Sequence, residues 1–130
     1  MRYIVALLFP WIFLFSEPNQ YFINHLVEKN GKFMKLFSNE AVSGDIFRYF
    51  LVSGQHRKEV FIGRVGLNGK HGEWKRWWDN GNIKSHGYYY KSKKLGLWTE
   101  WMKNGKKYSE IYYNYDSILF LKNCMKEECD

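Results

Sequence analysis

The chain has 130 residues, of which 45% are hydrophobic and 20% aromatic, and its formal net charge at pH 7 is +7. This length predicts one domain rather than several. Aliphatic residues are too few for a thick aliphatic core, so aromatic side chains must supply most of the apolar burial, which favours strands.

Residues 1–16 are predicted to be a signal peptide. The single cation Arg2 precedes an apolar run from Tyr3 to Phe15, and a polar segment begins at Ser16. A membrane-spanning helix needs about 20 apolar residues, so this run is short for a span and typical of an export signal. The protein is therefore expected to be periplasmic, envelope-associated or secreted. An uncleaved membrane anchor and a buried N-terminal element are the alternatives.

The segment 17–43 shows no clear pattern and is expected to be irregular or degenerate. Its Asn30-Gly31 pair is the one sign of a worn repeat copy. A clearer but degenerate copy follows at 44–67, where Gly63 stands 24 residues before Gly87.

A repeat of 24 residues becomes regular from residue 71. Residues 71–90 and 95–114 align without a gap, and every shared position has the same offset. Self-similarity at a fixed period is the signature of a repeat architecture. The shared positions, called the repeat framework below, are Gly72, Trp74, Trp77, Asn80, Gly81, Tyr88, Tyr89, Gly96, Trp98, Trp101, Asn104, Gly105, Tyr112 and Tyr113.

Turn signals arrive every 12 residues. Asn-Gly pairs stand at 68–69, 80–81 and 104–105, Ser92-Lys93 fills the slot between the last two, and Asp116-Ser117 fills the slot after them. Asn-Gly predicts a two-residue hairpin with a type I′ turn. Trp74 and Trp77 are also spaced as on one helix face, but Gly and Asn recur too often for a helix of useful length. Strands are expected near 59–67, 72–79, 82–91, 96–103 and 106–115.

The sequence therefore predicts an all-β fold, in which antiparallel β-hairpins form a meander and one elongated sheet over residues 44–116. Residues 117–130 are expected to be a C-terminal cap or tail. Within them, 117–126 form either a final strand or a short helical or irregular cap. The cap is preferred because an open repeat array needs closing.

No catalytic motif is visible. The sequence has no G-x-S-x-G elbow, phosphate loop or H-E-x-x-H,. A binding protein is expected rather than an enzyme, with no cofactor, metal or small-molecule substrate. Cys124 and Cys129 are the only cysteines. In an exported protein they can form a disulfide, whereas a zinc site would need four ligands.

The recurring aromatic residues have two interpretations. They can hold a single-layer sheet together, because each aromatic side chain buries about 150–250 Å², or their exposed members can form a ligand surface. The structural role is favoured for the recurring residues, and specific binding for residues that differ between copies. The candidate binding surface is Lys75, Arg76, Trp78, Lys93 and Lys94.

Residues 64–107 hold 11 Lys/Arg and 3 Asp/Glu, a balance of +8. Such a segment suits an acidic protein, an anionic membrane surface or a nucleic acid. Cations interleaved with aromatics are typical of proteins that bind single strands. However, Lys75 and Arg76 align with Thr99 and Glu100, so the cations are not expected to follow the repeat. A nucleic-acid partner is therefore disfavoured.

The pattern G-x-W-x-x-W-x-x-N-G, followed by paired tyrosines, resembles the MORN-type repeat in the variant found in many bacterial proteins, including antitoxin components. The resemblance covers residues 44–115 and is strongest over 68–115. It implies stacked β-hairpins in an elongated, curved sheet. It also implies binding or scaffolding, with proteins or membrane phospholipids as partners. Residues 21–43 do not fit the pattern.

Two main hypotheses follow. The first is an exported, non-enzymatic repeat module that binds a protein partner or an anionic membrane surface through one face of its sheet. The second is a cytoplasmic, antitoxin-like inhibitor that blocks a toxin protein by surface contact. A nucleic-acid-binding module is the third alternative.

Overall fold

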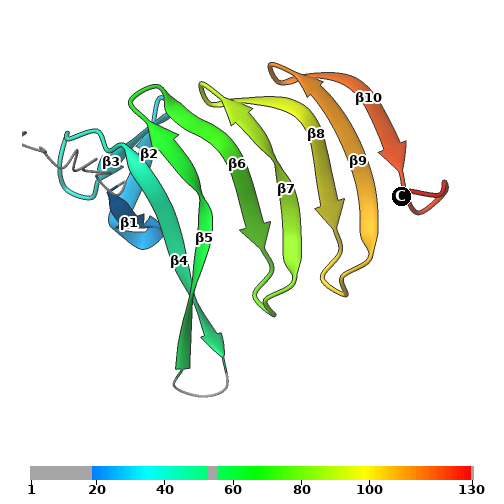
Figure 1. The fold of residues 1–130 in the computed structure, drawn as a ribbon, viewed down its shortest axis with the longest axis horizontal. Helices are drawn as coiled ribbons and strands as arrows, with labels where there is room; N and C mark the ends of the chain where they lie inside the picture. Colours follow the sequence, from blue (N-terminus) through cyan, green and yellow to red (C-terminus); the bar gives the residue numbers. More distant parts are fainter. Residues whose placement is uncertain (1–18, 53–55, 130) are drawn as a thin grey trace, which may run out of the picture.

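The computed structural model describes residues 19–52 and 56–129. Eight strands form one sheet in the order β1-β4-β5-β6-β7-β8-β9-β10, and β2 and β3 form a separate pair (Figure 1). A 3-10 turn, η1 (Ile23–His25), joins β1 to β2. The strands are β1 (Gln20–Phe22), β2 (Leu26–Lys29), β3 (Lys32–Lys35), β4 (Gly44–Val52), β5 (His56–Gly66), β6 (Gly69–Trp77), β7 (Ile83–Tyr90), β8 (Lys93–Trp101), β9 (Lys107–Asn114) and β10 (Ser117–Asn123).

From β4 to β10 the large sheet is a meander in which each strand pairs antiparallel with the next. Figure 1 shows β6 to β10 side by side and arching in the same direction. The predicted all-β fold of antiparallel hairpins is confirmed. Each of the five strands expected between residues 59 and 115 overlaps an observed strand, from β5 to β9.

Two features differ from the predicted single antiparallel sheet. β1 pairs with β4 in parallel, and β2 and β3 form a second sheet. The described part of 17–43 is therefore not irregular, and the alternative of a degenerate repeat copy stays a prediction. Asn30 and Gly31 have φ of 52° and 73° and make the type I′ turn of the β2–β3 hairpin. Phe33 of this hairpin is buried against Trp74, a contact between distant segments that no local pattern reveals.

The preference for a helical or irregular cap at 117–126 was also wrong. Tyr115 and Asp116 have φ of 48° and 71° and form a type I′ turn. This turn returns the chain onto β9, where it pairs as β10 from Ser117 to Asn123. The alternative of a final strand is what the structure contains.

The turn at Asn80-Gly81 is not of the predicted type I′. Gly81 has a φ of 87°, whereas Asn80 is not in the positive-φ region. The Trp78 N–H donates to the Asn82 carbonyl at 2.8 Å, and the Gly81 N–H donates to the Trp78 carbonyl at 3.1 Å. The loop therefore has three residues, a type I turn followed by a left-handed glycine. Strand register sets this loop length, and a dipeptide signal does not reveal register.

Two tryptophans lie at the centre of the core. Trp74 and Trp98 are only 6% and 3% exposed, and they cover Gly63 and Gly87 on the preceding strands. A Cβ at either glycine would collide with the indole. The core cluster comprises Phe33, Val42, Ile46, Ile62, Val65, Trp74 and Trp98.

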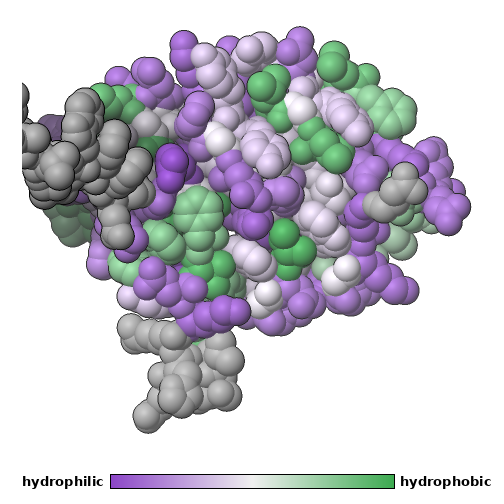
Figure 2. Space-filling view, in the orientation of Figure 1, coloured by the Kyte–Doolittle hydropathy of each residue, from purple (hydrophilic) through white to green (hydrophobic). Residues whose placement is uncertain are grey.

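The surface does not present one continuous apolar area in the view of Figure 2, where apolar side chains form separate patches among polar ones. In the described part of the chain, no helix has the length and apolar character needed to cross a membrane. The predicted signal peptide, residues 1–16, lies outside the described residues, so export stays a prediction.

Candidate functional site

One face of the large sheet carries a continuous row of aromatic rings, and we call it the tryptophan face. Its rings are those of Trp74, Tyr89, Trp98 and Tyr113. The centroids of successive rings are 5.9, 4.9 and 6.5 Å apart, with nearly perpendicular planes. Edge-to-face contacts of this kind stabilise a pair by about 0.5–1.5 kcal/mol beyond burial. The row therefore joins the two clear repeat copies into one core.

A lysine lies over each tryptophan–tyrosine pair of this row. Lys70 Nζ is 5.3 Å from the Trp74 ring centroid and 5.2 Å from that of Tyr89. Lys94 Nζ stands 4.6 Å from Trp98 and 4.8 Å from Tyr113. Because these lysines are 24 residues apart, the expectation that cations do not follow the repeat was wrong at this position. The repeat unit contains a cation over two rings.

An open groove of about 570 Å³ lies on this face. Its floor includes Trp74, Tyr89 and Trp98, and one wall is the β2–β3 hairpin with Leu26 and Phe33. We call it the cation groove, because five of the described residues that line it are basic and one, Glu28, is acidic. The basic residues are Arg48, Lys70, Lys75, Arg76 and Lys84.

Two of these cations are neutralised by carboxylates. Lys70 Nζ is 3.1 Å from Glu28 Oε2, and Lys75 Nζ is 3.2 Å from Glu73 Oε1.

The other three, Arg48, Arg76 and Lys84, have no ion pair within the described residues. Arg48 lies over the Phe50 ring at 4.2 Å, and Lys84 lies over the Trp78 ring at 4.3 Å. The groove therefore keeps positive charge that no described carboxylate balances.

A second hollow of about 450 Å³ adjoins the groove, and we call it the anchor pocket. Its apolar lining comes from Trp78, Trp101, Met102 and Met125, and Arg76 and Lys84 border both hollows. The pocket also contains Ser85, Glu100, Lys103 and Tyr108.

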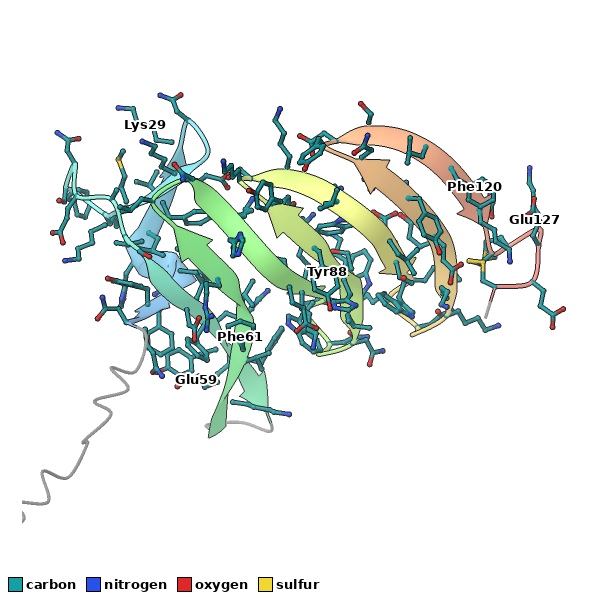
Figure 3. The ribbon with its side chains drawn as sticks, turned by 45° about the horizontal axis from the view of Figure 1, so that its top comes forward. Lys29, Glu59, Phe61, Tyr88, Phe120 and Glu127 are labelled. Atoms are coloured by element: carbon teal, nitrogen blue, oxygen red, sulfur yellow. A yellow bond between two sulfur atoms is a disulfide. The ribbon has the colours of Figure 1, made fainter. Side chains whose placement is uncertain are left out.

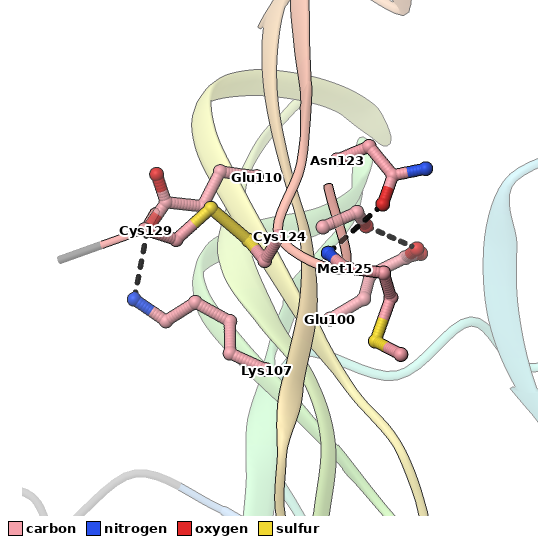
Figure 4. Close-up of a disulfide and its surroundings, with 8 residues drawn as sticks. Glu100, Lys107, Glu110, Asn123, Cys124, Met125 and Cys129 are labelled. Carbon is pink, nitrogen blue, oxygen red and sulfur yellow. Dashed lines mark hydrogen bonds and ion pairs between the residues drawn. A yellow bond between two sulfur atoms is a disulfide. The ribbon is translucent and has the colours of Figure 1, made fainter. Parts of the chain in front are cut away.

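Hydrogen bonds fix the polar side of the anchor pocket. The Tyr108 hydroxyl donates to Glu100 Oε2 at 2.6 Å, and the Ser109 hydroxyl donates to the same oxygen at 2.9 Å. The bond to Glu100 raises the pKa of Tyr108. Figure 4 shows Met125 beside Glu100, on the loop closed by the disulfide.

The Lys75 side chain extends to the opposite face of the sheet, where it joins a charged cluster. Glu73 Oε1 accepts a hydrogen bond from Lys75 and lies 2.8 Å from His86 Nε2. The hydrogen bond from Lys75, with the contact to His86, lowers the pKa of Glu73. On this opposite face, Tyr88 and Tyr112 are 50% and 43% exposed. Figure 3 shows side chains extending from both faces, with Tyr88 near the middle of the sheet.

The structure brings together three of the five residues of the predicted binding surface. Lys75 and Arg76 line the cation groove, and Trp78 lines the adjoining anchor pocket. Trp78 also has a structural role, because its indole N–H donates to the Trp101 carbonyl at 3.0 Å. Lys94 lies over Trp98 and lines neither hollow, and Lys93 is exposed at the start of β8.

The repeat framework divides by role. The tryptophan face is built by Trp74, Trp98, Tyr89 and Tyr113. The opposite face carries Tyr88 and Tyr112.

The remaining framework residues shape the backbone and the loops. Gly72 and Gly96 have φ of 73° and 71° at strand irregularities. The Asn80 and Asn104 side-chain oxygens each accept from the backbone N–H two residues later, at 3.1 and 3.0 Å. Trp77 lines the cation groove and packs edge-on against Phe50 at 6.3 Å, and Trp101 lines the anchor pocket.

Several site residues were missed by sequence reasoning. Arg48 and the β2–β3 wall reach the groove only through the tertiary fold. Met125 reaches the anchor pocket through the C-terminal loop. A usable signal did exist for Lys70, since its offset of 24 from Lys94 matches that of the tryptophans.

The two cysteines are bonded to each other, with a Cα–Cα distance of 5.3 Å. Among the described residues, no three His, Cys, Asp or Glu side chains are grouped so that they could hold a metal ion. The cation groove and the adjoining anchor pocket together suit recognition of an anionic or mixed anionic and apolar surface.

Comparison with protein-family models, with curated proteins and with solved structures found no match to this chain. The resemblance to MORN-type repeats therefore stays a prediction from the sequence.

Proposed function

We propose that this protein is a non-enzymatic binding module whose tryptophan face holds an acidic protein partner. The observation that carries the proposal is the cation groove. Arg48, Arg76 and Lys84 line it without an ion pair among the described residues, next to aromatic rings that supply apolar contact. Arginine and aromatic residues are enriched at protein interfaces. The resemblance to MORN-type repeats likewise favours binding over catalysis.

The shape of the site favours a protein over a membrane surface. The cations line a groove that the β2–β3 hairpin borders with Leu26 and Phe33. A protruding segment of a protein fits such a groove better than a flat layer of lipid headgroups does.

Nucleic acid is a poorer candidate because bases stack on open ring faces. Trp74 and Trp98 are almost fully buried, and Lys70 and Lys94 lie over them. An antitoxin-like inhibitor would use the same groove against a toxin protein.

The proposal is tested by charge reversal in the groove. The variant Arg48→Glu/Arg76→Glu/Lys84→Glu is compared with the native chain in photo-crosslinking capture from the source cells, followed by binding measurements with the purified partner. We expect the variant to lose binding. The matched control reverses three cations outside both hollows, Lys106→Glu/Lys122→Glu/Lys126→Glu, and should retain it.

Two further measurements separate the alternatives. Phosphatidylserine vesicles and a single-stranded oligonucleotide are titrated with the same three proteins. One outcome would refute the proposed protein partner. In it, the vesicles or the oligonucleotide bind the native chain and the control but not the groove variant, and no captured protein binds the native chain more tightly than the groove variant.

A further inference from the structure

The anchor pocket has the size and lining of a site for one large side chain. Its volume of about 450 Å³ falls within the range of about 300–1,000 Å³ that is usual for ligand sites. Trp78, Trp101, Met102 and Met125 make its apolar lining. Interface hot spots are commonly formed where a large side chain enters such a pocket.

The lining combines a fixed part with an adaptable part. The hydrogen bond from the Trp78 indole to the Trp101 carbonyl holds one ring in place. The methionines have flexible thioether chains that adjust to the shape of a ligand. Met125 is 63% exposed on the C-terminal loop, so it can close over an inserted group without disturbing the sheet.

Positive charge borders the mouth of the pocket. Arg76 and Lys84 line both the cation groove and the anchor pocket, and neither has an ion pair within residues 19–52 and 56–129. A carboxylate next to the inserted side chain would meet both cations.

The pocket also holds a buried hydroxyl group that has no hydrogen-bond partner among the described residues. Ser85 is 5% exposed, and its Oγ makes no hydrogen bond to any described residue. It lies between Arg76 and Glu100, its neighbours on the two adjacent strands. Buried polar groups are nearly always hydrogen-bonded in native proteins, so this hydroxyl would gain a partner if side chains of the pocket shift when a ligand binds.

From these four features we infer that the partner presents an extended acidic segment with one large apolar side chain. The apolar side chain enters the anchor pocket, and a flanking carboxylate pairs with Arg76 and Lys84. A polar backbone group of the segment meets the Ser85 hydroxyl. This inference rests on the proposed function and specifies the partner's chemistry.

Short blocked peptides test the inference without the natural partner. The probe is acetyl-Gly-Asp-Phe-Asp-Gly-amide, and the comparison peptides replace Phe by Ala or both Asp by Asn. The full chain carries methionines labelled with ¹³C in the methyl group, and chemical shifts are followed during titration. We expect the Phe peptide to shift the Met102 and Met125 methyl signals and to leave Met34, which lines neither hollow, in place. Each replacement should weaken binding about tenfold.

Variants locate the site. Met125→Ala and Arg76→Gln should each weaken binding of the Phe peptide several-fold, whereas the matched control Met34→Ala should not. Neither Met125 nor Arg76 is buried, so the fold should tolerate both changes.

The outcomes separate the anchor from the groove. If the Phe and Ala peptides bind equally well, or the Met34 signal shifts as much as that of Met125, the inference that an apolar side chain enters the anchor pocket is overturned. The proposed acidic partner then stands, provided that the Asn peptide binds more weakly. If none of the peptides binds at millimolar concentration, both proposals fail.

Discussion

The Trp98 indole lies directly over Gly87 on the neighbouring strand, and its N–H donates to the carbonyl of Tyr88 at 3.1 Å. The same relationship occurs 24 residues earlier. Trp74 covers Gly63 and donates to the Arg64 carbonyl at 2.9 Å. The recurring glycine and tryptophan are thus two halves of one contact, in which the glycine leaves the space that the ring fills.

Gly87→Ala should therefore destabilise the protein. The added Cβ would collide with the buried Trp98 ring, and overpacking of this kind costs about 1–3 kcal/mol. Thermal unfolding followed by circular dichroism measures the change. The matched control is Gly66→Ala, since a Cβ there meets no atom within 4 Å. Equal melting temperatures for the two variants would contradict the packing role of Gly87.

The turn glycines act through backbone conformation instead of contact. A Cβ at Gly81 meets nothing within 4 Å, but its φ is 87°, where an L-residue costs about 1–2 kcal/mol. Gly81→Val should therefore lower the free energy of unfolding by at least this amount. Lys75→Ala, which removes an ion pair at the surface, should change it by less than about 1 kcal/mol. Urea unfolding compares the two, and a smaller loss for Gly81→Val would refute the left-handed turn.

Much of the meander could be predicted, because the turns and strands of hairpin repeats are specified by residues close together in the sequence. Asn-Gly, the alternating aromatics and the offset between Trp74 and Trp98 are all visible in the sequence. The type of each turn could not be predicted from the pairs alone. Loop length depends on strand register, which is decided by cross-strand packing.

The candidate site was less predictable because it is assembled from distant segments. Arg76 and Trp78 differ between the repeat copies, which predicts a role in specific binding, and they border the two hollows. The groove wall comes from β2 and β3, and Arg48 comes from β4, so no local spacing connects them. The buried Ser85 is hidden in the sequence because serine at a strand position is usually exposed.

Lowering the pH should reduce the stability of the folded protein partly through protonation of Glu73. Its carboxylate interacts with Lys75 and His86, and the folded-state pKa lies below the ordinary value of 4.5. The stabilisation is complete above pH 4.5 and is lost as the pH falls through the lowered pKa. Melting temperatures between pH 7 and pH 3 should decline less steeply below pH 4.5 in Glu73→Gln than in the native chain. Glu128→Gln, at an exposed residue without an ion pair in the described chain, should decline as the native chain does.

The disulfide should matter more for the anchor pocket than for the sheet. The bond joins Cys124 to Cys129 across a sequence separation of 5, and closing so short a loop stabilises a protein by about 2 kcal/mol at most in the chain-entropy model. The Cys124 N–H also donates to the Tyr108 carbonyl at 2.9 Å, so β10 stays attached without the bond. In Cys124→Ser/Cys129→Ser, far-UV circular dichroism should therefore show an intact sheet.

The local effect of that variant should appear at Met125, which the closed loop holds beside Glu100 (Figure 4). Opening the loop frees this side chain, so its labelled methyl signal should sharpen and change position. The Met102 signal should change less, because Met102 follows β8 directly and its N–H donates to the Lys106 carbonyl. An unchanged Met125 signal in the serine variant, with the sheet intact, would show that the disulfide does not position the pocket wall.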